Sequence, residues 1–163
     1  MKKSVIVDVN AFLDGFGNLG TAVSFKQPAL KQKRVNSSTA AGDVSYAIGQ
    51  FESLDSEMSF ASVPRAVFDV MAKTDDGEVI LKKAIKEGSE TRNHMWTLTG
   101  AIDIEYGEAK AGEMLDVKVS QTGLKKYVYE IDNTLQVKID HENLICEIAG
   151  KDLLADTRQI LNA

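Results

Sequence analysis

The sequence predicts a β-rich α+β protein built mainly from antiparallel strands. Apolar and polar residues alternate over many short stretches, turn-forming residues separate some of these stretches, and only two segments have a helical pattern. Alternation with a period of two indicates a strand that has one buried face and one solvated face. We therefore expect two packed antiparallel sheets, arranged as a sandwich or a barrel-like structure, with two short helices.

Length and composition indicate one globular domain, residues 1–163. The chain has a net charge of −5, 44 % hydrophobic residues and 26 % charged residues, all ordinary for a folded domain of this size. The single cysteine excludes an intramolecular disulfide. No apolar run approaches the length of a membrane span, and Asp8 and Asn10 interrupt the N-terminal apolar stretch, so we expect neither a membrane anchor nor a cleaved signal.

The alternating stretches give the expected strands. The clearest cover residues 54–60, 97–106, 115–120 and 135–140, and shorter candidates cover 5–9, 19–25, 79–87 and 127–131. Asp132 and Asn133 separate the last of these from the 135–140 strand. Because Asp and Asn tolerate positive φ, this pair predicts a tight hairpin turn.

Two segments have a helical pattern instead. Pro64 can begin a helix at its first position, and Val67, Phe68 and Met71 then fall on one face, so we expect a short helix over 64–72. The second helix is expected over 151–161. Its apolar stripe consists of Leu153, Leu154, Thr157, Ile160 and Leu161.

Residues 31–50 are polar and lack a clear period, so we expect an extended loop there. Charge is also uneven in this region. Residues 26–34 contain four basic residues and no acid, whereas residues 43–78 contain eight acids and two bases. A solvated surface explains this pattern, and so does a head-to-tail contact between copies of the chain.

The sequence contains no convincing catalytic or metal-binding constellation. Gly15–Gly20 matches the dinucleotide fingerprint G-x-G-x-x-G, but a β-branched stretch and Pro28 follow where a helix would have to begin, so a glycine-rich turn is the better interpretation. His94 and His141 lack metal-ligand spacing, and Cys146 lies in a short alternating run as a small buried hydrophobe would. We expect a protein that is not an enzyme and binds no cofactor and no metal.

Several stretches, in this order and spacing, are shared with a known family. They are Asn10–Gly15, Val23–Leu30, Ala41-Gly42, Leu98–Gly100, Gly107–Glu113, Tyr127–Asp132, Ile139-Asp140 and Ala149–Leu153. On these residues the chain resembles, over nearly its whole length, the major tail tube proteins of contractile-tailed bacteriophages and of R-type pyocins. The chain departs from the family at two turns, where Asp132-Asn133 replaces Asp-Gly and Ala41-Gly42 replaces Gly-Gly; both keep the turn chemistry.

The resemblance implies a structural protein whose hexameric rings stack into a tube inside a contractile sheath. In a phage this tube is the conduit for DNA ejection into the host. The implied partners are further copies of the chain, the sheath protein, the baseplate and tail terminator proteins, and the tape measure protein and passing DNA in the lumen. The implied location is the virion tail, assembled in the host bacterial cytoplasm. Two alternatives stay open: a DNA-free contractile particle, such as a bacteriocin or another injection system, and a monomeric β-rich ligand-binding module.

The tail tube interpretation also gives candidate residues for assembly. A DNA conduit should be polar with acids in excess, because each phosphate–cation contact would have to break as DNA slides. The candidate lumen residues are Thr97, Thr99, Asp103 and Glu105, expected on one strand, and Asp116 and Lys118 on another. The alternative is that these faces point outward to the sheath. The candidate contacts between rings are Lys31, Lys33, Arg34 and Asp43.

Overall fold

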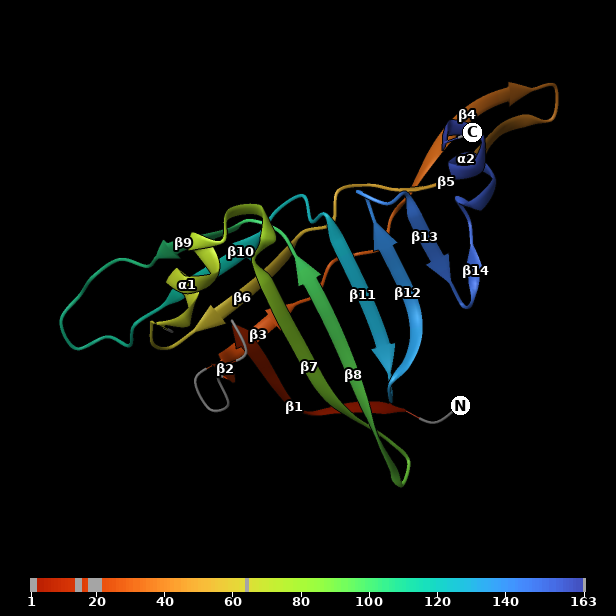
Figure 1. Cartoon of the computed structure of the whole chain (residues 1–163). Helices are drawn as coiled ribbons and strands as arrows, with labels where there is room; N and C mark the ends of the chain where they lie inside the picture. The colour runs from red at the N-terminus through yellow and green to blue at the C-terminus, as the bar shows by residue number, and fades with distance from the viewer. Residues whose placement is uncertain (1–2, 14–15, 18–21, 64, 163) are drawn as a thin grey trace.

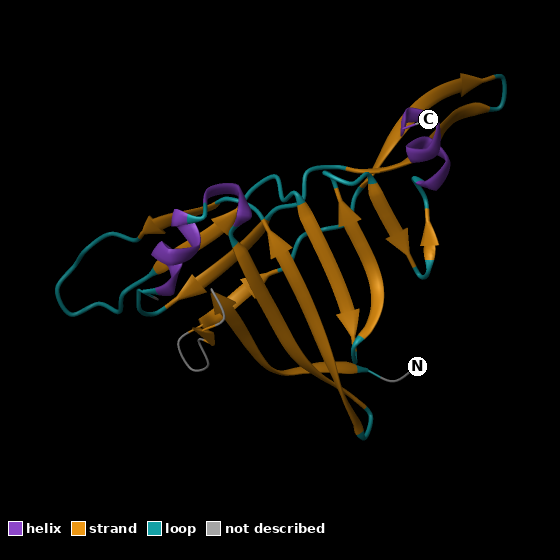
Figure 2. Ribbon diagram, in the orientation of Figure 1, coloured by secondary structure: helices purple, strands orange, loops and turns teal. Residues whose placement is uncertain are grey.

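Two antiparallel sheets pack face to face, and a two-stranded arm projects from one end of the molecule (Figures 1 and 2). The computed structural model describes residues 3–13, 16–17, 22–63 and 65–162. The large sheet has the order β14-β13-β12-β11-β8-β7-β1-β2, the small sheet the order β3-β6-β10-β9, and the arm consists of β4 and β5. The predicted fold class is confirmed in its antiparallel sheets and two helices; the described strands form no closed barrel.

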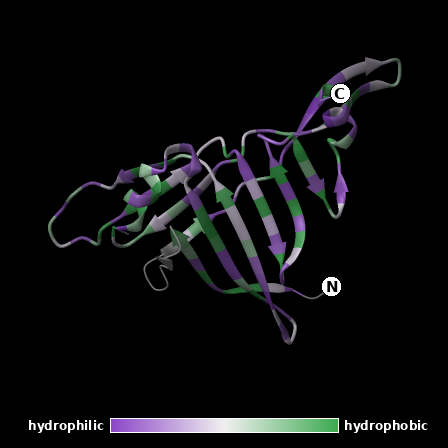
Figure 3. Ribbon diagram, viewed as in Figure 1, coloured by the Kyte–Doolittle hydropathy of each residue, from purple (hydrophilic) through white to green (hydrophobic). Residues whose placement is uncertain are grey.

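The strands follow the sequence pattern closely. Their bounds are β1 Ser4–Leu13, β2 Phe16–Gly17, β3 Ala22–Lys26, β4 Gln32–Thr39, β5 Gly42–Phe51, β6 Ser56–Phe60, β7 Glu78–Glu87, β8 Glu90–Thr99, β9 Ile102–Tyr106, β10 Val117–Gln121, β11 Lys126–Ile131, β12 Thr134–Asp140, β13 Ile145–Ile148 and β14 Lys151–Asp152. Figure 3 shows hydrophobic and hydrophilic residues alternating along the strands of the large sheet. The predicted turn at Asp132 and Asn133 is confirmed, with φ values of 48° and 65°.

The core lies between the two sheets. The large sheet contributes residues such as Leu81, Trp96 and Leu98, and the small sheet contributes Met58 and Val119; all five are at least 97 % buried. Strands such as β6, β8 and β10 therefore have one face in the core and one face directed outward, as the alternation predicts.

The predicted single strand over 97–106 is wrong, because the chain changes sheets in its middle. β8 ends at Thr99 in the large sheet and β9 begins at Ile102 in the small sheet. At this corner the Gly100 N–H donates a hydrogen bond of 2.9 Å to the Gly77 carbonyl. A Cβ atom on Gly77 would lie 2.8 Å from Val70 Cγ1 and 3.1 Å from the Gly100 oxygen, so the crossing leaves no room for a side chain there.

The first helix is confirmed as α1, Ala66–Ala72, followed by the 3₁₀ turn η1, Thr74–Asp76. Pro64, expected to begin it, lies outside the described residues. Val67 and Val70 are the buried residues of α1, and Met71 is half-buried. Phe68, expected on the buried face, is 47 % exposed, because positions 67, 70 and 71 define the face that meets the core.

The second helix, α2, is shorter than predicted and covers Ala155–Asn162. Residues 151–152 instead pair with β13 as strand β14. Asp152 then accepts a hydrogen bond from the Leu154 N–H and forms an ion pair of 2.8 Å with Arg158, which positions the first turn of the helix. None of the described side chains of α2 is buried.

Residues 31–50, expected as an extended loop, mostly form the hairpin β4–β5. A signal was present in Val44, Tyr46 and Ile48, which occupy every second position of β5. The sequence of β4 gives no matching signal, because that strand is mostly polar and all eight of its residues are exposed. The arm is closed at its root by a 2.8 Å hydrogen bond from the Glu52 N–H to the Lys31 carbonyl.

An aromatic cluster with a buried histidine occupies the core face of β8 and β11. The ring centroids of Trp96 and Tyr129 are 4.6 Å apart, and Lys83 Nζ lies 5.3 Å from the Trp96 centroid. His94 Nδ1 is 2.5 Å from the Tyr129 hydroxyl, and among the buried side-chain atoms of the described chain His94 Nε2 lacks a hydrogen-bond partner. Burial lowers the pKa of His94 below its usual value of 6.5. His94 is therefore a core residue.

We predict that Gly77→Ala destabilises the fold by about 1–3 kcal/mol, because the added methyl group overlaps backbone atoms of α1 and of the corner. The measurement is the midpoint of urea unfolding. Ala101→Ser, at an exposed neighbouring position, should leave the midpoint unchanged. Equal midpoints for both variants would show that the corner has space to relax.

We predict that stability falls as the pH drops below about 6.5. The unfolded chain binds a proton at His94 more readily than the folded chain, in which the pKa is lowered by burial. The stability that neutral His94 contributes is fully present above pH 6.5. It is lost as the pH falls toward the lower pKa that His94 has in the folded chain. His94→Gln should flatten urea unfolding free energies between pH 5 and pH 7, whereas His141→Gln, at an exposed turn, should not.

Candidate assembly surfaces

The six candidate lumen residues do not lie on one surface. Thr97 and Thr99 are on β8, on the face of the large sheet that points away from the core. Asp103 and Glu105 are on β9 and Lys118 is on β10, on the outward face of the small sheet. Asp116 immediately precedes β10. Because the core separates the two sheets, these two groups face opposite ways, and one channel can be lined by only one of them.

The outward face of the large sheet is broad and chemically mixed. Its half-buried apolar side chains include Phe12, Ile80, Met95 and Val128. Lys82 Nζ lies 4.9 Å from the centroid of the Phe12 ring. By register this face carries six acids and four lysines: Asp8, Glu78, Glu130, Asp140, Glu147, Asp152, Lys82, Lys86, Lys126 and Lys138.

The outward face of the small sheet is narrower and more polar. Across the strands it carries Ser24, Lys26, Glu57, Ser59, Lys118, Ser120, Asp103 and Glu105. Lys118 Nζ is 3.1 Å from a Glu57 carboxylate oxygen, and this hydrogen bond is the main cause that raises the Lys118 pKa. Asp103 and Glu105 form no ion pair within the described residues. Glu105 lies directly opposite Lys118 across the strands and also contributes to raising the Lys118 pKa, whereas Asp103 lies opposite Ser120. The face therefore carries three acids and two lysines.

The candidate contacts between rings lie on the arm and at its root. Lys31 precedes β4, Lys33 and Arg34 lie in β4, and Asp43 lies in β5. Arg34 donates a hydrogen bond to Ser45, and Asp43 accepts one of 2.7 Å from Ser38, so one face of the hairpin is polar and internally bonded. Within the part of the chain that the structure describes, Lys31 and Lys33 have no carboxylate partner.

The opposite face of the arm is an apolar stripe, a feature that sequence reasoning missed. It consists of Val35, Val44, Tyr46 and Ile48, which are 37–58 % exposed. Val35 pairs directly with Tyr46 across the hairpin. Isolated two-stranded hairpins are marginally stable in water. A partner that covered this apolar stripe would therefore stabilise the arm.

The described residues give no support for a catalytic or metal-binding site. No group of three or more His, Cys, Asp or Glu residues among them can hold a metal ion. Cys146 is 2 % exposed, and burial raises the pKa of its thiol, which is unfavourable for a nucleophile. The Gly15–Gly20 motif lies mostly outside the described residues. No helix within the described ranges is long and apolar enough to span a bilayer.

The fold and these surfaces define a β-sandwich suited to self-association through exposed polar faces and a projecting arm. Comparison with known proteins identifies its family. The family model of phage tail tube protein FII matches residues 3–161, so the chain belongs to this family of structural tail tube proteins. No individual curated protein matches the chain at significant similarity.

Solved structures agree at the level of the fold. A chain of the PVC sheath–tube complex of an extracellular contractile injection system, in the extended state, matches with a TM-score of 0.54 at 9 % identity, covering 75 % of this chain and 87 % of the other. The sheath/tube terminator of the same system matches with a TM-score of 0.55 at 9 % identity, and the match covers 76 % of this chain and 94 % of the terminator chain. The tube terminating cap of the anti-feeding prophage matches with a TM-score of 0.53 at 10 % identity, and the match covers 76 % of this chain and 86 % of the cap chain.

Proposed function

We propose that this protein is the tube subunit of a contractile tail, in which hexameric rings stack inside a sheath and enclose a channel for DNA. Membership of the tail tube family carries the proposal. Further copies, the sheath and a terminator are the proposed partners, since the structures of similar fold come from a sheath–tube complex and a terminator. The tape measure and baseplate proteins, and assembly in the cytoplasm of a host bacterium, follow from the same proposal.

The arm supports assembly between copies. Its apolar stripe has no covering element among the described residues, and Lys31 and Lys33 at its root are unneutralised. A contact with the adjacent ring would bury the stripe and pair these lysines with acids of a neighbour. This assigns Lys31, Lys33 and Arg34 to the contact between rings, with Asp43 on the polar face of the same arm.

The width of the small sheet suits a channel for a single duplex. Six four-stranded sheets side by side, with strands about 4.8 Å apart, would form a ring roughly 37 Å across between backbones. Six eight-stranded sheets would form a ring roughly 73 Å across. Strand tilt would widen both. The smaller value leaves room for side chains and one double helix, so we place the small sheet at the lumen.

The charge of the small sheet supports the same placement. Three acids (Glu57, Asp103 and Glu105) against two lysines (Lys26 and Lys118) would repeat around the ring and leave the wall with a small net negative charge. Like charge would hold DNA away from the wall. In this arrangement Asp116 and Lys118 also belong to the lumen side, and Thr97 and Thr99 do not. The apolar side chains on the open face of the large sheet are better suited to a protein contact.

A DNA-free particle is the second candidate. It is considered because the structures of similar fold belong to an extracellular contractile injection system and an anti-feeding prophage. At 9–10 % identity they establish the fold alone. Capsid and terminase genes beside the gene for this protein would support the phage, and their absence from a complete tail gene cluster would support the DNA-free particle.

We predict that the purified protein forms rings or tubes at high concentration and that the arm is needed for this. The variant Val44→Ser/Tyr46→Ser should unfold at the same urea concentration as the unchanged protein, because both side chains are exposed. It should nevertheless lose most of its assembly in negative-stain images and sedimentation. Val5→Ser, at an exposed position on β1, is a control for the loss of exposed apolar surface. A monomer at every concentration and at moderate salt would contradict the tube.

We predict that Asp103→Lys/Glu105→Lys leaves tube assembly intact but makes the channel retain DNA. The reversed charge adds cations where phosphates pass, so binding should weaken steeply with salt. Cryo-electron microscopy of tubes assembled with short duplex DNA would show density on the axis for the variant alone. Thr97→Lys/Thr99→Lys, on the opposite face of the sandwich, should give none. DNA bound along the outer wall of the first variant would place the small sheet outside.

A further inference from the structure

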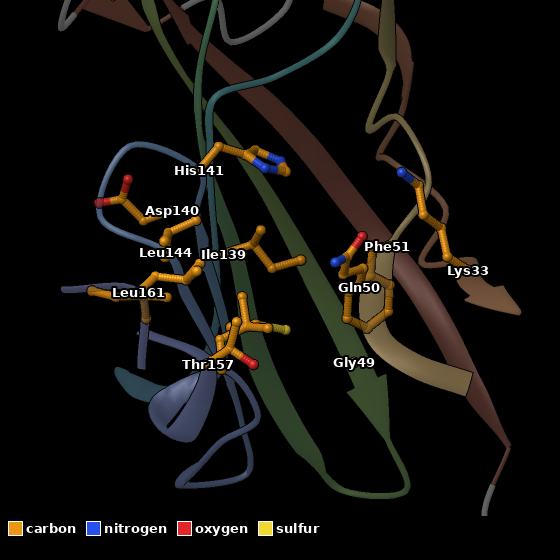
Figure 4. Close-up of a pocket in the computed structure, with 13 residues that line it drawn as sticks. Lys33, Gly49, Gln50, Phe51, Ile139, Asp140, His141, Leu144, Thr157 and Leu161 are labelled. Atoms are coloured by element: carbon orange, nitrogen blue, oxygen red, sulfur yellow. The ribbon is translucent and has the colours of Figure 1, made fainter. Parts of the chain in front are cut away.

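A pocket of about 290 Å³ opens between the root of the arm and the C-terminal segment (Figure 4). Its lining includes Phe51 from β5, Ile139 from β12, Leu144 and Leu161, with Lys33 at its edge. The space corresponds to roughly ten water molecules at liquid density. It lies where the root of the arm, β12, β13 and α2 meet.

The pocket is apolar, with one free charge at its edge. Leu161 is 67 % exposed although it lines the pocket, so its side chain has surface left to bury. Asp140 also lines the pocket, but its carboxylate accepts hydrogen bonds from the Glu142 N–H and from the backbone and side chain of Asn143. Lys33 therefore provides the unneutralised charge on this side.

The β9–β10 loop, residues 107–116, presents the complementary surface. Met114 is 85 % exposed and Leu115 is 48 % exposed. The loop is closed at its base by a hydrogen bond of 2.9 Å from the Gly107 N–H to the Asp116 carbonyl. Its positive-φ residue, Gly112, has φ = 87° and directs the chain into the segment that carries Met114. A methionine side chain adapts readily to an irregular apolar pocket.

Charge matches the two surfaces. Residues 107–116 contain three acids and one lysine, whereas Lys31, Lys33 and Arg34 form a basic group at the root of the arm. The loop and the pocket lie at opposite ends of the elongated molecule (Figure 1). A contact between them joins different surfaces of two copies, so it propagates from copy to copy rather than closing as a symmetric pair.

We infer that Met114 and Leu115 of one copy insert into the pocket of a second copy, with Glu113 of the loop facing Lys33 of that copy. The inference rests on the proposed self-assembly and specifies one of its contacts. The pocket would then be filled by a protein segment. The inference also accounts for the exposure of Met114 and Leu115, which are not buried by packing within the described chain.

Disulfide trapping tests the contact directly. In a chain carrying Cys146→Ala, Met114→Cys together with Leu161→Cys should form a ladder of covalent oligomers on mild oxidation under assembly conditions. Each single cysteine variant should give at most dimers. Met114→Cys with Ser89→Cys, at an exposed hairpin turn, is the matched control. No ladder from the first pair, or an equal ladder from the control pair, would overturn the inference.

A charge exchange tests the proposed pairing and separates its failure from failure of the tube. Lys33→Glu and Glu113→Lys should each reduce the assembled fraction at least tenfold, and the double variant should recover most of it. Met114→Asp should reduce assembly while leaving the urea midpoint unchanged. If the unchanged protein forms tubes and Met114→Asp forms them equally well, this contact is wrong and the tube stands. If the unchanged protein stays monomeric, both are wrong.

Discussion

The close approach of two backbones at Gly77 and Gly100 is the constraint on which the sandwich depends. The hydrogen bond between them joins the start of β7 to the point where the chain leaves β8. Because Gly77 has no side chain, the backbone of residue 100 can approach it closely, at the point where the chain passes from β8 in the large sheet to β9 in the small one. The core between the sheets, the opposite directions of their outer faces and the separation of Thr97 from Asp103 all follow from this crossing.

Much of the fold could be predicted from alternation, because burial on one face leaves a direct pattern in the sequence. Val117 and Val119 on β10, and the turn at Asp132, are examples. The corner could not be predicted in the same way. Residues 97–106 keep their alternation through Gly100, and the tight crossing becomes visible only when Leu124 lies against Gly100 and Val70 lies against Gly77. A continuous pattern shows which residues are buried, but not which sheet buries them.

The candidate assembly surfaces were predictable in composition but less so in geometry. The basic residues 31–34 and the carboxylates on β9 are evident from the sequence, and both are exposed in the structure. The arm was hidden because strands without a core do not need alternating burial, and only Val44, Tyr46 and Ile48 indicated a strand. The pocket could not be predicted at all, since it forms where β5, β12, β13 and α2 meet from distant parts of the chain.

The exposed arm also bears on how a polymer of this chain would begin. A hairpin with no core of its own gains little by being ordered alone, since the conformational entropy lost is offset only when another surface covers it. If the arm is ordered only by contact in the proposed tube, two free subunits that meet would both have to order their arms, whereas a subunit that joins an existing end would meet a surface already fixed. Starting a new polymer would then be slower than lengthening an existing one. The arm thus favours a few long polymers that grow from a template over many short ones that begin spontaneously.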